Sequence, residues 1–299
     1  MKRIITLILL LSTLFITSVV GKEISRVFPK KAELEIDCVL GSCEFQKSAD
    51  NRIHITVDYS YKEDYFTPVF DEQEDKLVIE EDLHENGHDF NNQNSNWIIK
   101  VPDGMEIEFS TATGKLSIKD ITAEFEGTCA TGSIRILNAN GEFEISSGTG
   151  NIELENCSGE FELNSGTGKV IAQGFKGELE ASSGTGKVEI EELYIMDFAE
   201  LNSGTGDVEL IGFSGENFEL ELNSGTGDVE LDMNGKKIQG HYTLSTIKHA
   251  GKIESDYKFD HIEEYNNGGE DRIRKSFSIG KADNTIEISS GTGNAVLKK

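Results

Sequence analysis

Basic residues are scarce in this sequence. Its 299 residues include 28 Lys and Arg but 54 Asp and Glu, so the formal charge at pH 7 is −26. A surface with this charge repels nucleic acid and anionic lipid, and it attracts cations or basic partners. We therefore expect no nucleic-acid partner, although an acidic surface also serves simply to keep a protein soluble.

Cysteine is sparse as well, and the spacing of the four cysteines matches no zinc motif. Cys38 and Cys43 lie close together and could form a disulfide in an oxidising compartment. Cys129 and Cys157 occupy different positions of the repeat described below, where we expect them to pack as small apolar residues. We expect no cofactor.

Long apolar runs are absent except at the N-terminus. Lys2 and Arg3 precede an apolar run from Ile4 to Val20, and small residues end at Gly21. This order is typical of a secretory signal peptide over residues 1–21. A retained membrane anchor is the alternative, but a run of about 17 residues is at the short limit for a membrane span. We therefore expect an exported protein, in the periplasm, at the cell surface or outside the cell, with no transmembrane segment after cleavage.

What the sequence has in abundance is one short repeat. The stretch Ser146-Ser147-Gly148-Thr149-Gly150 recurs with few changes, and its closing glycine falls at Gly114, Gly132, Gly150, Gly168, Gly186, Gly206, Gly227 and Gly293. The first four intervals are 18 residues each, and the next two are 20 and 21. A repeat this short cannot bury a core alone, so its copies must stack on one another.

Apolar residues alternate with polar ones on both sides of each closing glycine, which we number as position zero. Apolar pairs stand at positions −7 and −5, as in Phe143 and Ile145, and at +2 and +4, as in Ile152 and Leu154. This period of two is typical of half-buried strands, and helical spacing is absent from the region. The pattern predicts an all-β fold, a single-stranded parallel β-solenoid (β-helix) of about 18-residue coils. By analogy with other parallel crossovers, we expect it to be right-handed.

The Ser-Gly-Thr-Gly stretch is predicted to form one corner of each coil, called the SGTG corner below. Its Ser at −3 and Thr at −1 share the parity of the apolar positions, so we expect both hydroxyls to point inward. We expect the glycines to supply backbone angles that other residues adopt only at a cost. The stretch precedes a strand and lacks the Lys-Ser/Thr of a phosphate-binding loop, which excludes that site. The predicted corner residues include Ser147, Thr149, Gly150, Ser165, Thr167, Gly168, Ser183, Thr185 and Gly186.

Position −6 carries Glu in all eight regular copies, which are Glu108, Glu126, Glu144, Glu162, Glu180, Glu200, Glu221 and Glu287. In a stack of coils these side chains would lie about 5 Å apart, so like charges would face one another. A partial second column stands at +3, with Glu153, Glu189, Glu209 and Glu230. One interpretation is weak binding of divalent cations along the column, with Glu144, Glu162, Glu180, Glu200 and Glu221 as candidates. The other is a solvated negative face that keeps sheets apart, because Glu alone on a flat face coordinates metal poorly.

The less regular segments lie at the two ends. We expect residues 22–100 to form an N-terminal β-rich cap or lead-in region, and residues 101–299 to form the solenoid domain. Residues 256–284 are an insertion that is either a lid over the last coils or a variable loop. The final copy, which ends around Gly293, is expected to close the stack.

The sequence resembles the bacterial "putative adhesin" β-strand-repeat family, a domain of unknown function found in cell-envelope β-solenoids. The resemblance rests on the turn Val101-Pro102-Asp103-Gly104, followed by many short Ser-Gly coils behind a signal peptide, and it covers about residues 30–299. It implies no enzymatic activity and supplies no catalytic residues.

The resulting hypothesis is an exported, non-enzymatic, adhesin-like binding or structural protein that presents a repetitive acidic face to an unidentified protein or glycan of the envelope. The alternative is a carbohydrate-active β-helix enzyme, a polysaccharide lyase or hydrolase. Such an enzyme should show clustered carboxylates beside a basic or aromatic cleft, whereas a binding rod should show repeating ladders.

Overall fold

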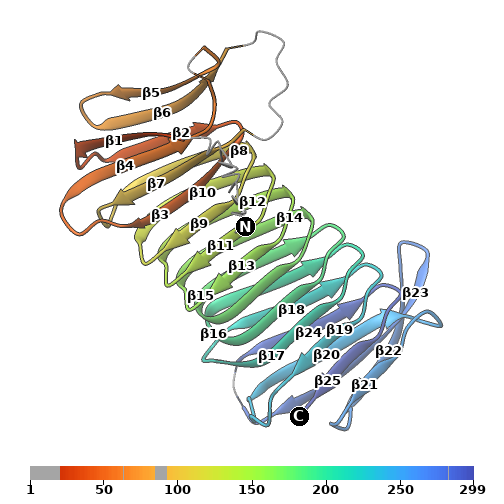
Figure 1. Cartoon of the computed structure of the whole chain (residues 1–299). Coiled ribbons are helices and arrows are strands. Elements are labelled where there is room, and N and C mark those ends of the chain that lie inside the picture. The colour runs from red at the N-terminus through yellow and green to blue at the C-terminus, as the bar shows by residue number, and fades with distance from the viewer. Residues whose placement is uncertain (1–20, 63, 85–92, 282) are drawn as a thin grey trace, which may run out of the picture.

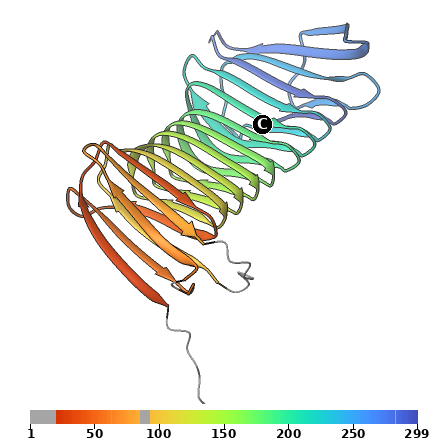
Figure 2. The same cartoon turned by 90° about the horizontal axis from the view of Figure 1, so that it is seen from above.

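The computed structural model describes residues 21–62, 64–84, 93–281 and 283–299. In these residues it contains 25 strands and no helix, so the prediction of an all-β fold is confirmed. Nothing in the described part of the chain is a helix long and apolar enough to cross a membrane. Residues 1–20, which make up nearly all of the predicted signal peptide, lie outside the described residues. The strands stack into an elongated body with the N-terminal strands at one end and the C-terminal strands at the other (Figure 1, Figure 2).

Each regular coil contributes one strand to each of two faces. Face A, formed by the strands that precede the SGTG corner, contains β8 (Glu106–Thr113), β10 (Thr122–Thr131), β12 (Asn140–Thr149), β14 (Ser158–Thr167), β18 (Glu219–Ser224) and β24 (Thr285–Ser290). Face B, formed by the strands that follow it, contains β9 (Leu116–Lys119), β11 (Ile134–Leu137), β13 (Ile152–Glu155), β17 (Val208–Gly215), β19 (Val229–Asp232) and β25 (Ala295–Lys298).

Two longer strands, β15 (Val170–Ser183) and β16 (Val188–Ser203), begin on face B and continue onto face A. Along both faces each strand pairs in parallel with its equivalent in the next coil.

The core lies between the two faces and consists of ladders of identical or similar side chains. Phe125, Phe143 and Phe161 are buried at position −7 of successive coils, and the rings of Phe143 and Phe161 stack with centroids 4.5 Å apart. Ile134 and Ile152 form an equivalent ladder on face B. Full burial of such a side chain contributes about 1.5–3 kcal/mol. One coil buries only a few of these side chains, so stability accumulates along the stack.

At the N-terminal end, the stack continues into residues that precede Val101, out of chain order. β2 (Glu33–Cys38) and β3 (Gly41–Lys47) form a coil beside β8 and β9, with Cys43 level with Leu116. β6 (Lys76–Leu83) and β7 (Ser95–Val101) stack in parallel beyond that coil. Antiparallel strands complete this end: β4 (Arg52–Tyr59) and β1 (Lys22–Pro29) follow β7, and β5 (Phe66–Glu72) pairs with β6.

At the C-terminal end, the last copy of the repeat does not close the stack, so that prediction was wrong. β24 pairs on one side with β18 and on the other with β20 (Gly240–Ile247), and β25 lies between β19 and β21 (Ile253–Ser255). An earlier segment of the chain therefore lies outside the last copy. The insertion 256–284 is not a variable loop, because it contains the antiparallel hairpin of β22 (His261–Asn267) and β23 (Glu270–Ile279), and β23 pairs with β20.

Candidate functional site

The glutamates at position −6 form one straight column across face A. Strand pairing places nine of them level with one another, one per coil: Glu35, Glu108, Glu126, Glu144, Glu162, Glu180, Glu200, Glu221 and Glu287. The spacing of adjacent strands in a sheet is about 4.8 Å. Uncharged residues stand at both ends of this first column, Val78 beside Glu35 and Thr243 beside Glu287.

A second column of carboxylates runs beside the first, two residues earlier on each strand. It consists of Glu33, Glu106, Glu124, Glu142, Glu160 and Glu178, again one per coil. This column was not predicted from the sequence, although Glu at position −8 recurs at the same 18-residue interval. The column is interrupted at Phe198, which takes the next −8 position after a shift in strand register between Gly177 and Leu179, and Glu219 takes the following one.

A neutral polar row completes the face at position −4. Its members are Ser110, Thr128, Ser146, Asn164, Ser182, Asn202, Asn223 and Ser289. The amide nitrogen of Asn164 donates to Oε1 of Glu162 over 2.7 Å, and Asn202 donates to Glu200 over the same distance. These amides orient individual carboxylates but do not neutralise them.

The negative charges of face A are almost uncompensated. Lys76, which bridges Glu33 and Glu35, is the only cation among the described residues with an ion pair to either column. Partial burial raises the pKa of the Glu180 carboxyl, and the neighbouring charges of Glu162 and Glu200 raise it further. The pKa values of Glu108 and Glu178 are raised for the same reasons, with burial first. Protons and other cations are therefore drawn to this face.

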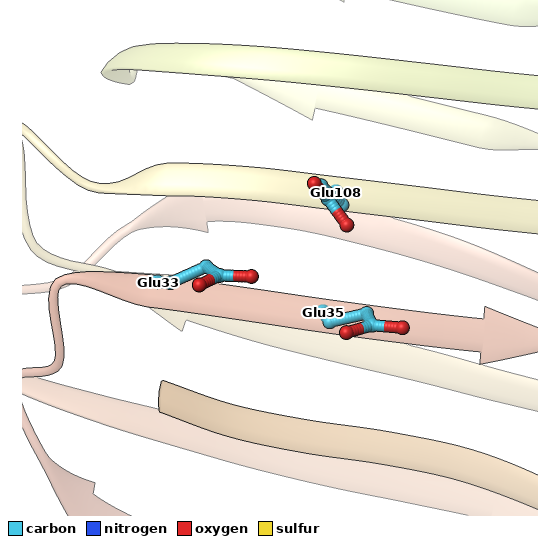
Figure 3. A group of neighbouring side chains, drawn as sticks. All are labelled: Glu33, Glu35 and Glu108. Atoms are coloured by element: carbon cyan, nitrogen blue, oxygen red, sulfur yellow. The ribbon is translucent and has the colours of Figure 1, made fainter. Parts of the chain in front are cut away.

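One group of three carboxylates lies close enough to share a metal ion. Oxygen atoms of Glu33, Glu35 and Glu108 all lie within 4.8 Å of one another (Figure 3). The ammonium group of Lys76 already contacts two of the three. Within the described ranges, none of the candidates predicted from the sequence belongs to such a group, namely Glu144, Glu162, Glu180, Glu200 and Glu221. Their geometry is that of a row along the stack and not of a cage around one point.

Face B is different, because its acidic column is broken and paired. Between Glu153 and Glu189 the column contains Ile171. Lys187 contacts both Glu189 and Glu209, and Lys298 contacts Glu230. The hydrogen bonds to these two glutamates raise the pKa of Lys187 despite its partial burial. The two faces thus have similar strands, but the carboxylates of face B are partly paired with lysines and most of those of face A are not.

The corner serines point into the stack and join successive coils. Ser165 Oγ donates to the carbonyl of Gly150 over 2.9 Å, and Ser147 Oγ donates to Gly132 over 3.1 Å. Ser183 Oγ donates to Gly168 and accepts from the N–H of Gly186, both over 2.8 Å. The serine hydroxyls of the corner are therefore occupied by hydrogen bonds to the backbone of the stack.

Two details of the corner differ from expectation. Thr149, Thr167 and Thr185 are exposed, so the alternation of buried and exposed positions holds through the serine at −3 and fails at position −1. The closing glycines are needed because the backbones of neighbouring coils approach each other closely at this point, and not because the chain adopts unusual backbone angles there. A Cβ on Gly168 would lie 2.1 Å from the carbonyl oxygen of Gly150, and its φ is not in the left-handed region.

All four cysteines are buried, free thiols. Cys38 ends β2 and Cys43 lies in β3, on either side of one corner. Burial raises the pKa of both thiols well above the ordinary value, and the nearby Glu81 carboxylate adds to the effect. A disulfide between Cys38 and Cys43 stays a prediction.

Comparison with known proteins identifies one matching domain family. The Toastrack DUF4097 family model matches residues 32–255. No curated protein matches the chain significantly.

Two solved structures each cover 93% of the chain with a TM-score of 0.32. One is a "putative cell adhesion protein" from Clostridium sporogenes ATCC 15579, which is 15% identical over 99% of its own chain. The other is a "putative adhesin" from Parabacteroides merdae ATCC 43184, which is 10% identical over 96% of its own chain. Similarity this distant carries no argument about function.

Proposed function

Because the chain belongs to the Toastrack DUF4097 family, a domain family of unknown function, we propose that it is an exported, non-enzymatic binding or structural protein of the cell envelope. In this proposal its stacked coils present face A to a cationic partner, either a basic segment of an envelope protein or a positively charged polymer. The role is adhesin-like, since it consists of association and not of chemistry.

The observation that supports this proposal is the contrast between the two faces. Like charges directly opposite one another on neighbouring strands are destabilising. On face B, Lys187 and Lys298 relieve that repulsion, whereas on face A the first column runs through nine coils with Lys76 as its one paired cation among the described residues. A cationic partner would supply the missing compensation.

Repetition makes weak contacts effective. A single exposed ion pair contributes about 0–1 kcal/mol. A flexible polycation that contacts several glutamates of the first column at once gains affinity from every additional contact, because each contact after the first is intramolecular. We therefore expect affinity to rise steeply with the number of charges on the partner and to fall steeply with salt.

We extend the proposal to the architecture. A right-handed winding agrees with the general preference of parallel crossovers. In this arrangement residues 22–100 serve as the N-terminal β cap and residues 101–299 as the solenoid domain, with the insertion 256–284 covering its far end. Antiparallel strands at both ends support a capping role, because they shield the parallel edges of the stack.

A matched pair of triple variants tests the proposal. In the first, Glu144→Gln, Glu162→Gln and Glu180→Gln remove three charges from face A. In the second, Glu153→Gln, Glu189→Gln and Glu209→Gln remove three charges from face B. Binding of an oligolysine peptide to the purified protein, measured by calorimetry at two salt concentrations, should weaken about tenfold or more with the first variant only. Equal loss in both variants would mean that net charge alone attracts the peptide, and the proposal would fail.

The alternative of a polysaccharide lyase or hydrolase needs a separate test. A screen against acidic and neutral polysaccharides would reveal an enzyme by released products. Loss of those products on substitution of one Asp or Glu would replace the binding proposal with a catalytic one.

A further inference from the structure

The regular coil is lengthened at one corner only. From β8 onwards, the residues added to the regular coils enter at the corner opposite the SGTG corner, after a face B strand and before the next face A strand. Strand register assigns two extra residues to positions 196–197 and three to positions 216–218, and residues 233–284, which include β20 to β23, are inserted at the same corner between β19 and β24. In repeat proteins, insertions that gather on one side commonly form the binding face.

These lengthened corners enclose two adjoining hollows. One has a volume of about 410 Å³ and is lined by Asp197, Phe198, Phe218, Glu219 and Asp283, together with Asn217. The other, of about 390 Å³, also includes Asn217 and extends to Lys237 and Gln239. Asn217, with φ of 55°, therefore stands between the two hollows.

The walls of the hollows are held together by one buried side chain. Asn284, which is 4% exposed, donates from its amide nitrogen to the carbonyl of Gln239 over 2.8 Å. Its amide oxygen accepts from the backbone N–H of Phe218 over 3.1 Å. Asn284 thus connects the corner before β18, the segment before β20 and the residue that leads into β24. Pre-organised walls reduce the entropy lost when a ligand binds.

The lining combines an aromatic ring, amides and carboxylates. Phe198 is half-buried and takes the place of a glutamate in the second carboxylate column of face A, next to Glu219. A sugar ring packs its apolar C–H face on such a ring, and its hydroxyls bond with amides such as those of Asn217 and Gln239. Asp197, Glu219 and Asp283 around the first hollow favour a positive charge on the ligand and disfavour a negative one.

We propose that these hollows bind an amino-sugar unit with a free ammonium group, carried on an oligosaccharide. Its sugar ring packs against Phe198, its ammonium group lies among Asp197, Glu219 and Asp283, and its hydroxyls contact Asn217 and Gln239. This site lies at the edge of face A, where Phe198 and Glu219 stand two residues before Glu200 and Glu221 of the first column, so it adds a specific saccharide contact to the general attraction for cations.

The test measures binding of two tetrasaccharides to the purified protein by calorimetry or by NMR titration. The probes are the tetramer of glucosamine and its fully N-acetylated counterpart, which has the same backbone and hydroxyls but no charge. The charged tetramer should bind at least about tenfold more tightly, since a hydrogen bond to a charged group contributes about 1.5–3 kcal/mol and 1.4 kcal/mol is a factor of ten. Glu219→Gln and Asn217→Gly should each weaken its binding about tenfold. Glycine keeps the left-handed backbone of Asn217 without strain.

Matched controls separate this site from general charge attraction. Glu153→Gln removes one charge from face B, and Asn156→Gly makes the same substitution at a regular corner, where φ is 54°. Both should leave binding unchanged within about twofold. Equal weakening by Glu219→Gln and Glu153→Gln, or no binding of the charged tetramer, would overturn the proposal. Oligolysine binding that depends on face A would still support the general function in that case.

Discussion

The buried carboxylate of Glu81 accepts a hydrogen bond from the indole Nε1 of Trp97 over 2.7 Å. The same carboxylate accepts bonds from Ser95 Oγ and from the backbone N–H groups of Val39 and Leu40. In this coil the corner position that serine holds from Ser147 onwards is occupied by Cys38, which has no hydroxyl. The carboxylate of Glu81, in the adjoining coil, therefore accepts hydrogen bonds from the backbone of this corner in place of a serine hydroxyl.

Glu81→Gln should lower the free energy of unfolding by about 2–4 kcal/mol, because an amide nitrogen would replace an acceptor that faces buried donors. Chemical denaturation would measure the change. Glu80→Gln, one residue earlier and exposed, is the matched control and should change stability by less than about 0.5 kcal/mol. Similar effects of both substitutions would contradict a structural role for Glu81.

Ser183→Ala should destabilise the protein by about 1–3 kcal/mol, because the carbonyl of Gly168 and the N–H of Gly186 both lose their bond to the hydroxyl. Thr185→Ala, two residues away and exposed, should be nearly neutral. The comparison can be made by thermal or urea unfolding. A larger effect at Thr185 would mean that the threonine, and not the serine, holds the corner.

Glu180→Gln should make the protein more stable at pH 7 than the wild type. Because the folded state raises the pKa of this carboxyl, it favours the protonated form, and that contribution to stability is lost as pH rises through the raised pKa. The advantage of the variant should therefore shrink as pH falls toward the ordinary pKa of Glu. Melting temperatures of both proteins, measured from about pH 4 to about pH 7, would show the trend.

Asp103→Asn serves as a control of opposite sign for that experiment. Its hydrogen bond with Lys47 lowers the pKa of Asp103, so its contribution is present at neutral pH and lost as pH falls through the lowered pKa. The variant should be less stable than the wild type at pH 7, with the difference vanishing in acid. If both variants changed stability at pH 7 in the same direction, the assigned directions of the two pKa shifts would be wrong.

Calcium chloride and sodium chloride at equal ionic strength should raise the melting temperature by similar amounts, since both screen the repulsion along face A. A row of single carboxylates does not form the oxygen cage that calcium prefers. A much larger shift with millimolar calcium would instead establish cation binding along the column, with Glu144, Glu162, Glu180, Glu200 and Glu221 as its first candidates.

Cys38 and Cys43 should react slowly with an alkylating reagent in the native protein, because burial raises the pKa of both thiols and thiolate is the reactive form. Unfolding should accelerate the reaction strongly. Intact mass before and after reduction, on protein from an oxidising compartment, would reveal whether the predicted disulfide forms. Fast alkylation of the folded protein would contradict the buried positions.

Local pattern was sufficient to predict the strands and the first carboxylate column. Phe143 and Phe161 recur at the same position of the coil, so their stacking and the alignment of Glu144 with Glu162 follow from the 18-residue period. The order of coils at the two ends was not predictable in this way. Whether Glu221 lies beside Glu287 or beside Thr243 depends on long-range pairing, because residues 233–284, which include Thr243, precede Glu287 in the chain without altering the repeat itself.

The outward threonines show a second limit of sequence reasoning. Strict alternation assigns Thr149 to the inside, but Gly148 and Thr149 are both exposed where β12 ends at the corner. The second carboxylate column was missed for a simpler reason. Glu at position −8 is as regular as Glu at −6 over six coils, but Phe198 interrupts the pattern before the repeat ends.

The strands that end the stack also determine how many glutamates the first column of each molecule contains. Parallel coils could in principle add further coils from another copy, as in a fibril. Here β1 and β5 are antiparallel edge strands, and two of the three prolines of the chain, Pro29 and Pro68, lie in them, where each removes a backbone donor. At the other end the edges are the three-residue β21 and the hairpin strand β22. The number of glutamates in the first column is thus set by the length of one chain, because neither end of the stack favours the addition of coils from another copy.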